Sequence, residues 1–226
     1  MNNSSGLTQD DSVTDAQGAG GASMLRAKGL RLEKVAEADF PTQFGFFRIF
    51  GFRTVLPSGV IEEAVVLRMG DLTTGEPPLV RVHSQCLTGD VFHSLRCDCR
   101  AQLEIALETI AREGRGLLIY EHQEGRGIGL LNKLRAYELQ DHGADTVEAN
   151  ERLGFDSDLR SYALPGAILQ FFGLKSIRLL SNNPEKVQAV EDAGITVVER
   201  VPCVADIVDT RQAYLQTKKD KMGHLL

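Results

Sequence analysis

The sequence predicts an α/β fold: a layered mixed sheet flanked by helices, with a β-rich N-terminal part. Two observations support this prediction. Between residues 30 and 69, aromatic and apolar residues alternate with polar ones in runs such as F-G-F-F-R-I-F-G-F-R, which is typical of strands. After residue 78, short apolar runs alternate with longer stretches of helical spacing, as expected where strands and helices alternate along a chain.

Length and composition restrict the possible functions. The 226 residues suit one α/β domain with appendages, and a hydrophobic content of 42% is enough for a sizeable core. The net charge of −6 disfavours nucleic acid as a partner, although a basic pocket for one phosphate-bearing metabolite is compatible with it. We find no apolar run long enough for a membrane span and no signal-peptide pattern, so we expect a cytoplasmic protein without a membrane partner.

The chain begins with a segment that differs in composition from the rest. Residues 1–28 are rich in Ser, Gly, Asp and Asn, and such a segment buries too little surface to offset its ordering entropy. We therefore predict a disordered tail over 1–28 and a single domain over 29–226. Within that domain, residues 30–69 form the β-rich part, and 70–78 form a turn-rich connector. The run L-V-R-V at 79–82 is then predicted to be a half-buried strand.

Helices and strands alternate in the second half. Apolar residues spaced by three and four predict an amphipathic helix from about Cys99 to Gly114. Asn183 and Pro184 are typical of a helix start, and Gly194 of the end of that same helix. The other elements are predicted as strands at 116–120, 176–182 and 195–201, a helix at 130–140, and a polar C-terminal helix with an apolar end at 210–226.

Three cysteines follow the strand at 79–82 in a chain with few cysteines: Cys86, Cys97 and Cys99. Thiolates bind zinc in tetrahedral geometry, and three protein ligands leave the fourth position to a water whose pKa falls toward neutrality. Gly89 and Asp90 supply the turn that folds the connecting loop back. The spacing therefore indicates a hydrolytic zinc centre.

Two other interpretations of these cysteines stay open. They are small apolar groups that suit a protein core, and a structural zinc would take His83 or His93 as its fourth ligand. Core packing does not require two thiols separated by one residue in the polar context R-C-D-C. Metal binding is therefore favoured over buried thiols, whereas the spacing favours a catalytic zinc over a structural one only slightly. Cys203 lies apart from the others and is predicted to be a buried thiol.

A second feature is the glycine-rich turn E-G-R-G-I-G at 124–129, directly after a predicted buried strand. Such a turn allows the backbone to approach a phosphate at a helix start, and Arg126 adds a charged fork. It matches neither the dinucleotide fingerprint nor the P-loop, and alone it indicates only a turn. Arg81 and Arg126 are both expected at carboxyl ends of strands, where ligands collect. With Ser181 and Lys186 beside a later helix start, the set suits a triphosphate.

A third feature is D-L-R at 158–160, which by itself indicates a solvated ion pair in a loop. Its functional interpretation depends on the other motifs of the chain. The segments R-V-H-S-Q-C-L-T-G-D, S-L-R-C-D-C, Q-E-G-R-G-I-G, D-L-R-S-Y and S-N-N-P-E-K resemble, in their order, GTP cyclohydrolase II of riboflavin biosynthesis. The resemblance runs from about residue 32 to 226, and it implies a GTP cyclohydrolase II-like catalytic domain at 29–226 that forms a homodimer.

The resemblance also implies a reaction. In that family three cysteines hold one zinc ion per chain, whose water attacks C8 of guanine; the imidazole ring opens and formate is released. Here the ligands would be Cys86, Cys97 and Cys99. An arginine attacks the α-phosphate and pyrophosphate leaves; the matching residue is Arg160, with Asp158 as its proton acceptor and Mg²⁺ on the phosphates. The product would be 2,5-diamino-6-(5-phospho-ribosylamino)pyrimidin-4(3H)-one, the first intermediate of the riboflavin pathway.

Further site residues follow from the same resemblance. Tyr137 matches a tyrosine near the zinc site, and its presence favours the complete reaction over one that stops at a formylated intermediate. The implied contacts to GTP are Arg81, Val82, His83, Ser84, Gln85, Gln102, Glu124, Gly125, Arg126, Thr146, Ser181 and Lys186.

Three residues depart from those usual in the family: Gln85 replaces a glutamate, Arg100 a small residue and His122 an arginine. Two alternatives to the complete reaction therefore stay open. One is a paralogue that forms a formylated intermediate for another pathway, and the other is a non-catalytic GTP-binding protein with structural zinc. Binding alone does not require Asp158, Arg160 and Tyr137, so their presence favours an enzyme.

Overall fold

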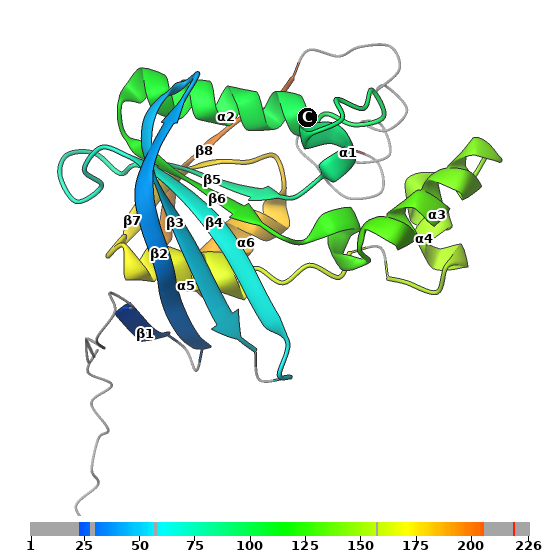
Figure 1. The fold of residues 1–226 in the computed structure, drawn as a ribbon, viewed down its shortest axis with the longest axis horizontal. Coiled ribbons are helices and arrows are strands. Elements are labelled where there is room, and N and C mark those ends of the chain that lie inside the picture. The colour runs from blue at the N-terminus through cyan, green and yellow to red at the C-terminus, as the bar shows by residue number, and fades with distance from the viewer. Residues whose placement is uncertain (1–22, 28–29, 57, 157, 206–218, 220–226) are drawn as a thin grey trace, which may run out of the picture.

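The computed structural model describes residues 23–27, 30–56, 58–156, 158–205 and residue 219 (Figure 1). Their elements, in chain order, are β1 (Ser23–Ala27), β2 (Leu30–Thr42), β3 (Gly45–Val55), β4 (Ile61–Met69), β5 (Leu79–Ser84), α1 (Leu87–Asp90), α2 (Cys99–Glu113), β6 (Gly116–Glu121), a 3₁₀ turn η1 (Glu124–Gly127), α3 (Leu130–Asp141), α4 (Thr146–Arg152), α5 (Ala163–Phe171), β7 (Ser176–Leu180), α6 (Pro184–Asp192) and β8 (Thr196–Val201).

All described strands belong to one mixed sheet in the order β1-β2-β3-β4-β6-β5-β7-β8. The pairs from β1 to β4, and β4 with β6, are antiparallel, whereas β6, β5, β7 and β8 run parallel to one another. The four parallel strands therefore end at the same edge of the sheet, at Ser84, Glu121, Leu180 and Val201. In open α/β sheets this edge is where ligands bind.

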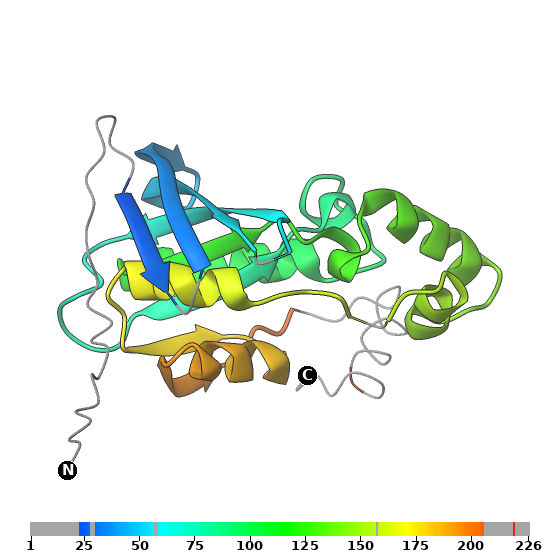
Figure 2. The ribbon, with the colours of Figure 1, turned by 90° about the horizontal axis from the view of Figure 1, so that it is seen from below.

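Helices cover both faces of the sheet, which gives three layers (Figures 1 and 2). On one face α2 packs Ala106 and Ile110 in a cluster with Leu118 of β6. On the opposite face α5 packs Ile168 in a second cluster with Ile119, the next residue of the same strand. Successive side chains of a strand point to opposite faces, so a stretch of strand buried on both sides is apolar, as Leu117, Leu118 and Ile119 of β6 are.

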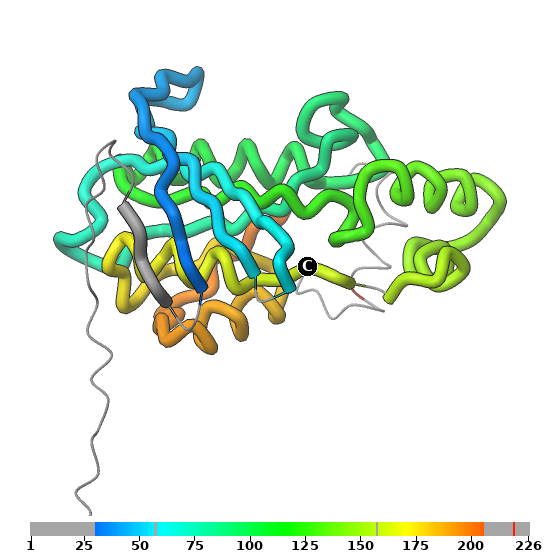
Figure 3. Tube along the Cα trace, turned by 60° about the horizontal axis from the view of Figure 1, so that its bottom comes forward, coloured from blue at the N-terminus to red at the C-terminus, as the bar shows by residue number. Residues whose placement is uncertain are grey.

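Helices α3 and α4 lie beyond the end of the sheet and pack against each other (Figure 3). Their contact is made by small residues, Ala136, Ala144 and Ala149. Asp145 starts α4 with a complete capping box, because its carboxylate accepts hydrogen bonds from the Val147 and Glu148 amides and the Glu148 carboxylate accepts one from the Asp145 amide. This pair of helices forms one wall of the site described below.

The structure confirms the predicted α/β class, with its mixed sheet, flanking helices and strand-rich N-terminal part. Helix α2 ends where predicted, at Gly114, whose φ of 66° is left-handed and suits glycine. Asn183 caps α6 through the Glu185 amide, with Pro184 in the first turn. The short α1 and the helices α4 and α5 were not predicted.

Parts of two predictions lie outside the described residues. In the segment predicted as a tail, residues 1–22 and 28 are not described, while Ser23–Ala27 pairs antiparallel with β2, so the sheet includes residues before 29. The helix predicted at 210–226 also lies outside, apart from residue 219. Among the described helices, none has both the length and the apolar content to cross a membrane.

Candidate active site

The three cysteines converge at the carboxyl end of β5. Cys86 precedes α1, Cys99 begins α2, and Cys97 lies in the loop between these helices. The three sulfur atoms lie within 4.8 Å of one another, and those of Cys86 and Cys97 are 3.7 Å apart. Zn–S bonds of ~2.3 Å in a tetrahedron place sulfur atoms ~3.8 Å apart, so the spacing fits a zinc ion.

The donor set also suits a cation. Hydrogen bonds from the Cys97 and Cys99 thiols lower the pKa of Cys86. The contact with Cys86 in turn raises the pKa of Cys97 to about 11 and the pKa of Cys99 well above its ordinary value. The Cys97 and Cys99 thiols thus stabilise a thiolate on Cys86, and the thiolate is the form in which cysteine binds a metal. Among the described residues neither His83 nor His93 joins this group, so the structure does not support a histidine as fourth ligand.

Asp90 organises the turn that carries the first cysteine. Its Oδ2 accepts hydrogen bonds from the Cys86 amide at 3.0 Å and from the Tyr120 hydroxyl at 2.7 Å. Nε2 of the buried His83 lies 3.2 Å from Oδ1 of the same carboxylate. Asp90 therefore does more than the predicted turn chemistry, because it fixes both the turn and the strand end from which the turn departs.

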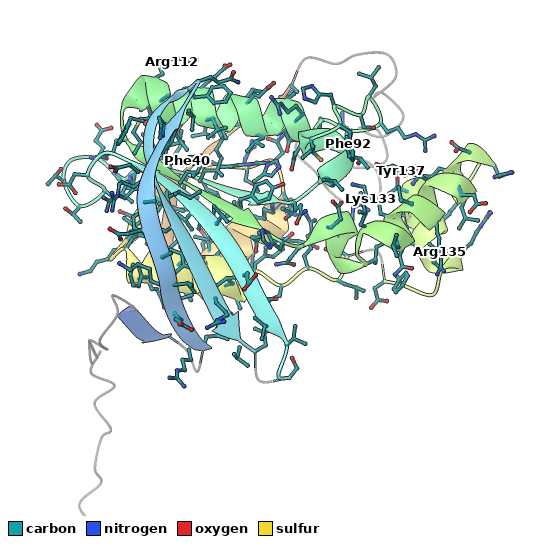
Figure 4. The ribbon with its side chains drawn as sticks, in the orientation of Figure 1. Phe40, Phe92, Arg112, Lys133, Arg135 and Tyr137 are labelled. Atoms are coloured by element: carbon teal, nitrogen blue, oxygen red, sulfur yellow. The ribbon has the colours of Figure 1, made fainter. Side chains whose placement is uncertain are left out.

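Lys133 and Tyr137 project from α3 toward this turn, whereas Arg135 lies on the other side of the helix (Figure 4). The Lys133 ammonium lies 3.1 Å from the Cys86 sulfur and 2.7 Å from Glu124 Oε1. The Tyr137 hydroxyl lies 3.1 Å from Thr88 Oγ1, which is 3.7 Å from the Cys86 sulfur. Burial raises the pKa of Tyr137, so its phenol stays protonated and able to donate.

The glycine-rich turn after β6 supplies an arginine that has no ion-pair partner among the described residues. Arg126 has a φ of 59°, the left-handed region that non-glycine residues rarely adopt. Both of its terminal guanidinium nitrogens are buried without a hydrogen-bond partner in the part of the chain that the structure describes. Desolvating a cation in this way is costly, so an anion is the expected partner.

The same turn holds the D-L-R segment. The Leu159 amide donates to the Arg126 carbonyl at 3.0 Å. A Cβ atom on Gly127 would lie 3.0 Å from the Leu159 carbonyl carbon, so glycine permits this close approach. The two motifs, which the sequence presents as separate features, are therefore one structural unit.

Asp158 and Arg160 form a nearly buried ion pair, with side chains 12% and 11% exposed. Nε of Arg160 lies 2.9 Å from Asp158 Oδ1, and a terminal nitrogen contacts Oδ2. Burial works against the charge on each group, but the hydrogen bonds between them outweigh it; they lower the pKa of Asp158 and raise the pKa of Arg160. An isolated D-x-R motif indicates a solvated ion pair, whereas in this fold the pair is nearly buried.

Beneath this pair lies a buried cluster at the ends of β5 and β6. Lys186 Nζ donates to the Val82 carbonyl at 2.9 Å and to Ser84 Oγ at 3.2 Å. A terminal nitrogen of Arg160 lies 3.4 Å from the same hydroxyl. Burial lowers the pKa of Lys186 well below its ordinary value, and it raises the pKa of Glu121 to about 7. Glu121 was not among the predicted site residues.

One cavity of about 1110 Å³, counting its mouth that is open to solvent, joins the cysteines to these charged groups. All predicted site residues line it except Val82 and Asp158. The Val82 side chain lies in the core instead, because alternate residues of β5 point to opposite faces. Residues that line the cavity but were not predicted are Arg96, Gln123, Ile128, Lys133, Ala136, Gln140, Asn150, Asn182 and Asn183.

Some predicted contact residues are held by the protein itself. Arg81 donates to Gln102 Oε1 at 2.7 Å and to the Leu180 carbonyl at 2.9 Å. Glu124 Oε2 accepts from the Leu87 amide at 2.6 Å, while its Oε1 pairs with Lys133. The Glu124 carboxylate therefore connects the glycine-rich turn to the cysteine turn.

The three unusual residues take different positions. Gln85 lines the cavity. Arg100 pairs with Glu104 at 2.6 Å and donates to the Asp90 carbonyl at 2.8 Å, so it joins α1 to α2. His122 is exposed and has an edge contact with Tyr120. Of the three, Gln85 has direct access to a ligand.

Comparison with known proteins agrees with this geometry. A family model described as GTP cyclohydrolase II matches residues 33–202. The GTP cyclohydrolase-2 proteins of Pseudomonas entomophila (strain L48) and Pseudomonas putida (strain W619) are 56% and 57% identical over 192 residues, which are 85% of this chain and 92% of each of those proteins. The riboflavin biosynthesis protein RibBA of Bacillus cereus (strain ATCC 14579) is 56% identical over 191 residues, but the matched region is only 47% of its length.

Among solved structures, the chain overlaps in part with RibBX, a two-domain 3,4-dihydroxy-2-butanone 4-phosphate synthase from A. baumannii. The TM-score is 0.43 at 19% identity, over 77% of this chain and 40% of that one.

Proposed function

The chain belongs to the GTP cyclohydrolase II family, a family of hydrolases, and from this we propose that it carries out the complete reaction on GTP. The imidazole ring of guanine opens at C8, formate and pyrophosphate leave, and the product is 2,5-diamino-6-(5-phospho-ribosylamino)pyrimidin-4(3H)-one. One observation carries the proposal: three convergent cysteines and the buried Arg160 line the same cavity. The first of these groups suits hydrolysis of the base, and the second suits chemistry on the phosphates.

At the base end, Cys86, Cys97 and Cys99 would hold one zinc ion, since their sulfur spacing fits it. When bound, zinc supplies a Lewis acid and brings the pKa of a water toward neutrality. Tyr137 keeps its proton and points to Thr88 beside Cys86, so its phenol is placed to donate to an oxyanion that develops at C8.

At the phosphate end, we propose that cationic side chains bind the triphosphate, with Mg²⁺ accompanying it. Arg126 is suited to this role, because its terminal nitrogens are buried without a partner among the described residues. Lys186, buried beside Ser84, and the guanidinium of Arg160 lie on the same cavity wall. An anion bound here would relieve the repulsion between Lys186 and the Arg160 guanidinium, which is one cause of the lowered pKa of Lys186, and would thereby favour the charged form of Lys186.

Arg160 is proposed as the nucleophile toward the α-phosphate. A terminal nitrogen of Arg160 forms a bond to the α-phosphorus while the bridging oxygen leaves with pyrophosphate. The proton of that nitrogen passes to Asp158, which already contacts the guanidinium, and water later cleaves the P–N bond. Because the ion pair raises the pKa of Arg160, the proton leaves only as the bond to phosphorus forms.

The wider proposal keeps the expectations from the sequence. A single catalytic domain over 29–226 would work in riboflavin biosynthesis, as the name of the RibBA relative suggests. A homodimer in the cytoplasm remains part of the proposal, and the reducing conditions there suit a site built from thiolates. The net charge of −6 argues against nucleic acid as a partner.

Product analysis tests the proposal. The zinc-loaded protein is incubated with GTP and Mg²⁺, and formate, pyrophosphate and the pyrimidine product are counted against the GTP consumed. Equal amounts of all three support the complete reaction. A product that retains the formyl group identifies the early-stopping paralogue, and binding of GTP without turnover identifies a nucleotide-binding protein.

A further inference from the structure

The side chain of Gln123 holds the backbone of Ser161 with two hydrogen bonds. Its Nε2 donates to the Ser161 carbonyl at 2.6 Å, and its Oε1 accepts from the Ser161 amide at 2.9 Å. The same Nε2 also donates to Glu121 Oε1 at 3.0 Å. Each N–H of the amide thus has an acceptor and its oxygen has a donor, so the orientation of the amide is determined.

This clamp acts on the segment that carries Arg160. Residues 158–162 are neither helix nor strand. Arg160 lies between two residues whose backbones are each bonded to the turn after β6: Leu159 to the Arg126 carbonyl, and Ser161 to Gln123. The turn itself follows a strand at the centre of the sheet, so it is a rigid reference for whatever is attached to it.

We propose that Gln123 is a positioning residue for Arg160, which holds the arginine at the reacting distance from the α-phosphate through its two hydrogen bonds to Ser161. This inference rests on the proposed function. Asp158 orients the guanidinium, whereas Gln123 fixes the position of the backbone next to Arg160, from which that guanidinium extends. Misplacement of a reacting group by 1 Å costs about a hundredfold in rate, so a loss of the clamp reduces turnover while all the residues proposed to bind GTP are kept.

The experiment compares Gln123→Ala and Gln123→Met with the wild type, with release of pyrophosphate measured over a range of GTP concentrations. The methionine variant keeps the volume of the side chain and loses only its hydrogen bonds, so it remains informative if the alanine variant folds poorly. We expect kcat to fall by about tenfold to a hundredfold, with KM within about threefold and zinc content unchanged.

Gln170→Ala is the matched control. Gln170 also holds a backbone carbonyl through its side-chain amide, with Nε2 donating to Ala193 at 2.6 Å, and it does not line the cavity. This variant loses a comparable hydrogen bond between α5 and the end of α6, and we expect its kcat to equal that of the wild type. A similar loss of kcat in both glutamine variants would overturn the proposal, since it would reflect general destabilisation.

The double variant Gln123→Ala/Arg160→Ala separates positioning from an independent effect. If Gln123 acts through Arg160, the double variant releases pyrophosphate at the residual rate of Arg160→Ala alone. A further decrease by the factor seen for Gln123→Ala would overturn the proposal, and so would wild-type kcat in both Gln123 variants. If Arg160→Ala itself releases pyrophosphate at the wild-type rate, the nucleophile role of Arg160 fails, and this inference falls with it.

Discussion

A Cβ atom on Gly89 would lie 2.7 Å from the Cys97 sulfur, closer than side chains approach one another in proteins. It would also lie 3.1 Å from both the Cys86 sulfur and Cβ of Cys99. The three cysteines are thus packed around a position that only glycine can occupy without displacing them. This contact, rather than the flexibility of glycine, explains why the turn between the first two cysteines contains one.

Gly89→Ala is therefore expected to lower the zinc content of the purified protein. The added methyl group pushes the sulfurs away from the spacing that a tetrahedral ion requires. Metal analysis and competition with a chelator measure the effect. Gly51→Ala is the control, since a Cβ atom there has no neighbour within 4 Å. Equal zinc affinity in the two variants would contradict the proposed ligand geometry.

Cys97→Ser should abolish stable zinc binding and release of formate together, because a hydroxyl is a much poorer zinc ligand than a thiolate. Cys203→Ser is the comparison: Cys203 is fully buried but lies outside the three-cysteine group, and its thiol donates to the Gln102 carbonyl at 3.6 Å. The Cys203 variant should keep one zinc per chain. Full release of formate by zinc-free Cys97→Ser protein would disprove a zinc-dependent reaction.

Arg160→Ala should reduce pyrophosphate release by at least about a hundredfold, because it removes the proposed nucleophile and a cation that faces the phosphates. Arg178→Ala provides a control, since Arg178 is also paired with a carboxylate, Glu113, but lies away from the cavity. Pyrophosphate is measured directly in single-turnover reactions. Unchanged release by the Arg160 variant would remove this residue from the nucleophile role.

Tyr137→Phe should separate the two halves of the reaction. Loss of the hydroxyl that contacts Thr88 removes the proposed donor near the cysteines and leaves the phosphate end of the cavity intact. We expect pyrophosphate release to continue while the pyrimidine product retains its formyl group, as detected by mass spectrometry. Stoichiometric formate from the phenylalanine variant would show that the phenol is not required.

Glu121 predicts a pH dependence of stability. Burial raises the pKa of its carboxyl from 4.5 to about 7, although Lys186 and Arg160 lower it and Glu62 raises it further. Between these two pH values the folded state holds a proton that the unfolded state has lost, so this group's contribution to stability falls as pH rises from 4.5 to about 7. The full loss corresponds to about 3 kcal/mol.

The side-chain amide of the Glu121→Gln variant cannot ionise, so this variant does not lose stability in this way as the pH rises. Relative to the wild type, its free energy of unfolding should therefore increase as the pH rises from about 5 to 8, by up to the same amount. Urea unfolding at several pH values measures the difference. A difference between the two proteins that is independent of pH would show that Glu121 does not titrate in this range.

Local features of the chain were predictable because they depend on neighbouring residues. The helix from Cys99 to Gly114, the Asn183 cap and the strand that begins with the apolar run at 117–119 follow from spacing and backbone preferences that operate within a few residues. The cysteine ligand set could be named for the same reason, since Cys97 and Cys99 are two positions apart. The apolar helix α5 was not predicted, because a short run of mostly apolar residues is as typical of a buried strand as of a buried helix.

Contacts between distant parts of the chain could not be predicted, because they depend on how the strands are ordered in the sheet. Gln123 and Ser161 are 38 positions apart, and Lys186 lies 104 positions from the Val82 carbonyl to which it donates. These contacts depend on the order β6-β5-β7 in the sheet, which brings the ends of strands from separate parts of the chain to one edge. Sequence patterns therefore identified the candidate residues and the family of the chain, whereas the cavity follows from the strand order, which long-range packing sets.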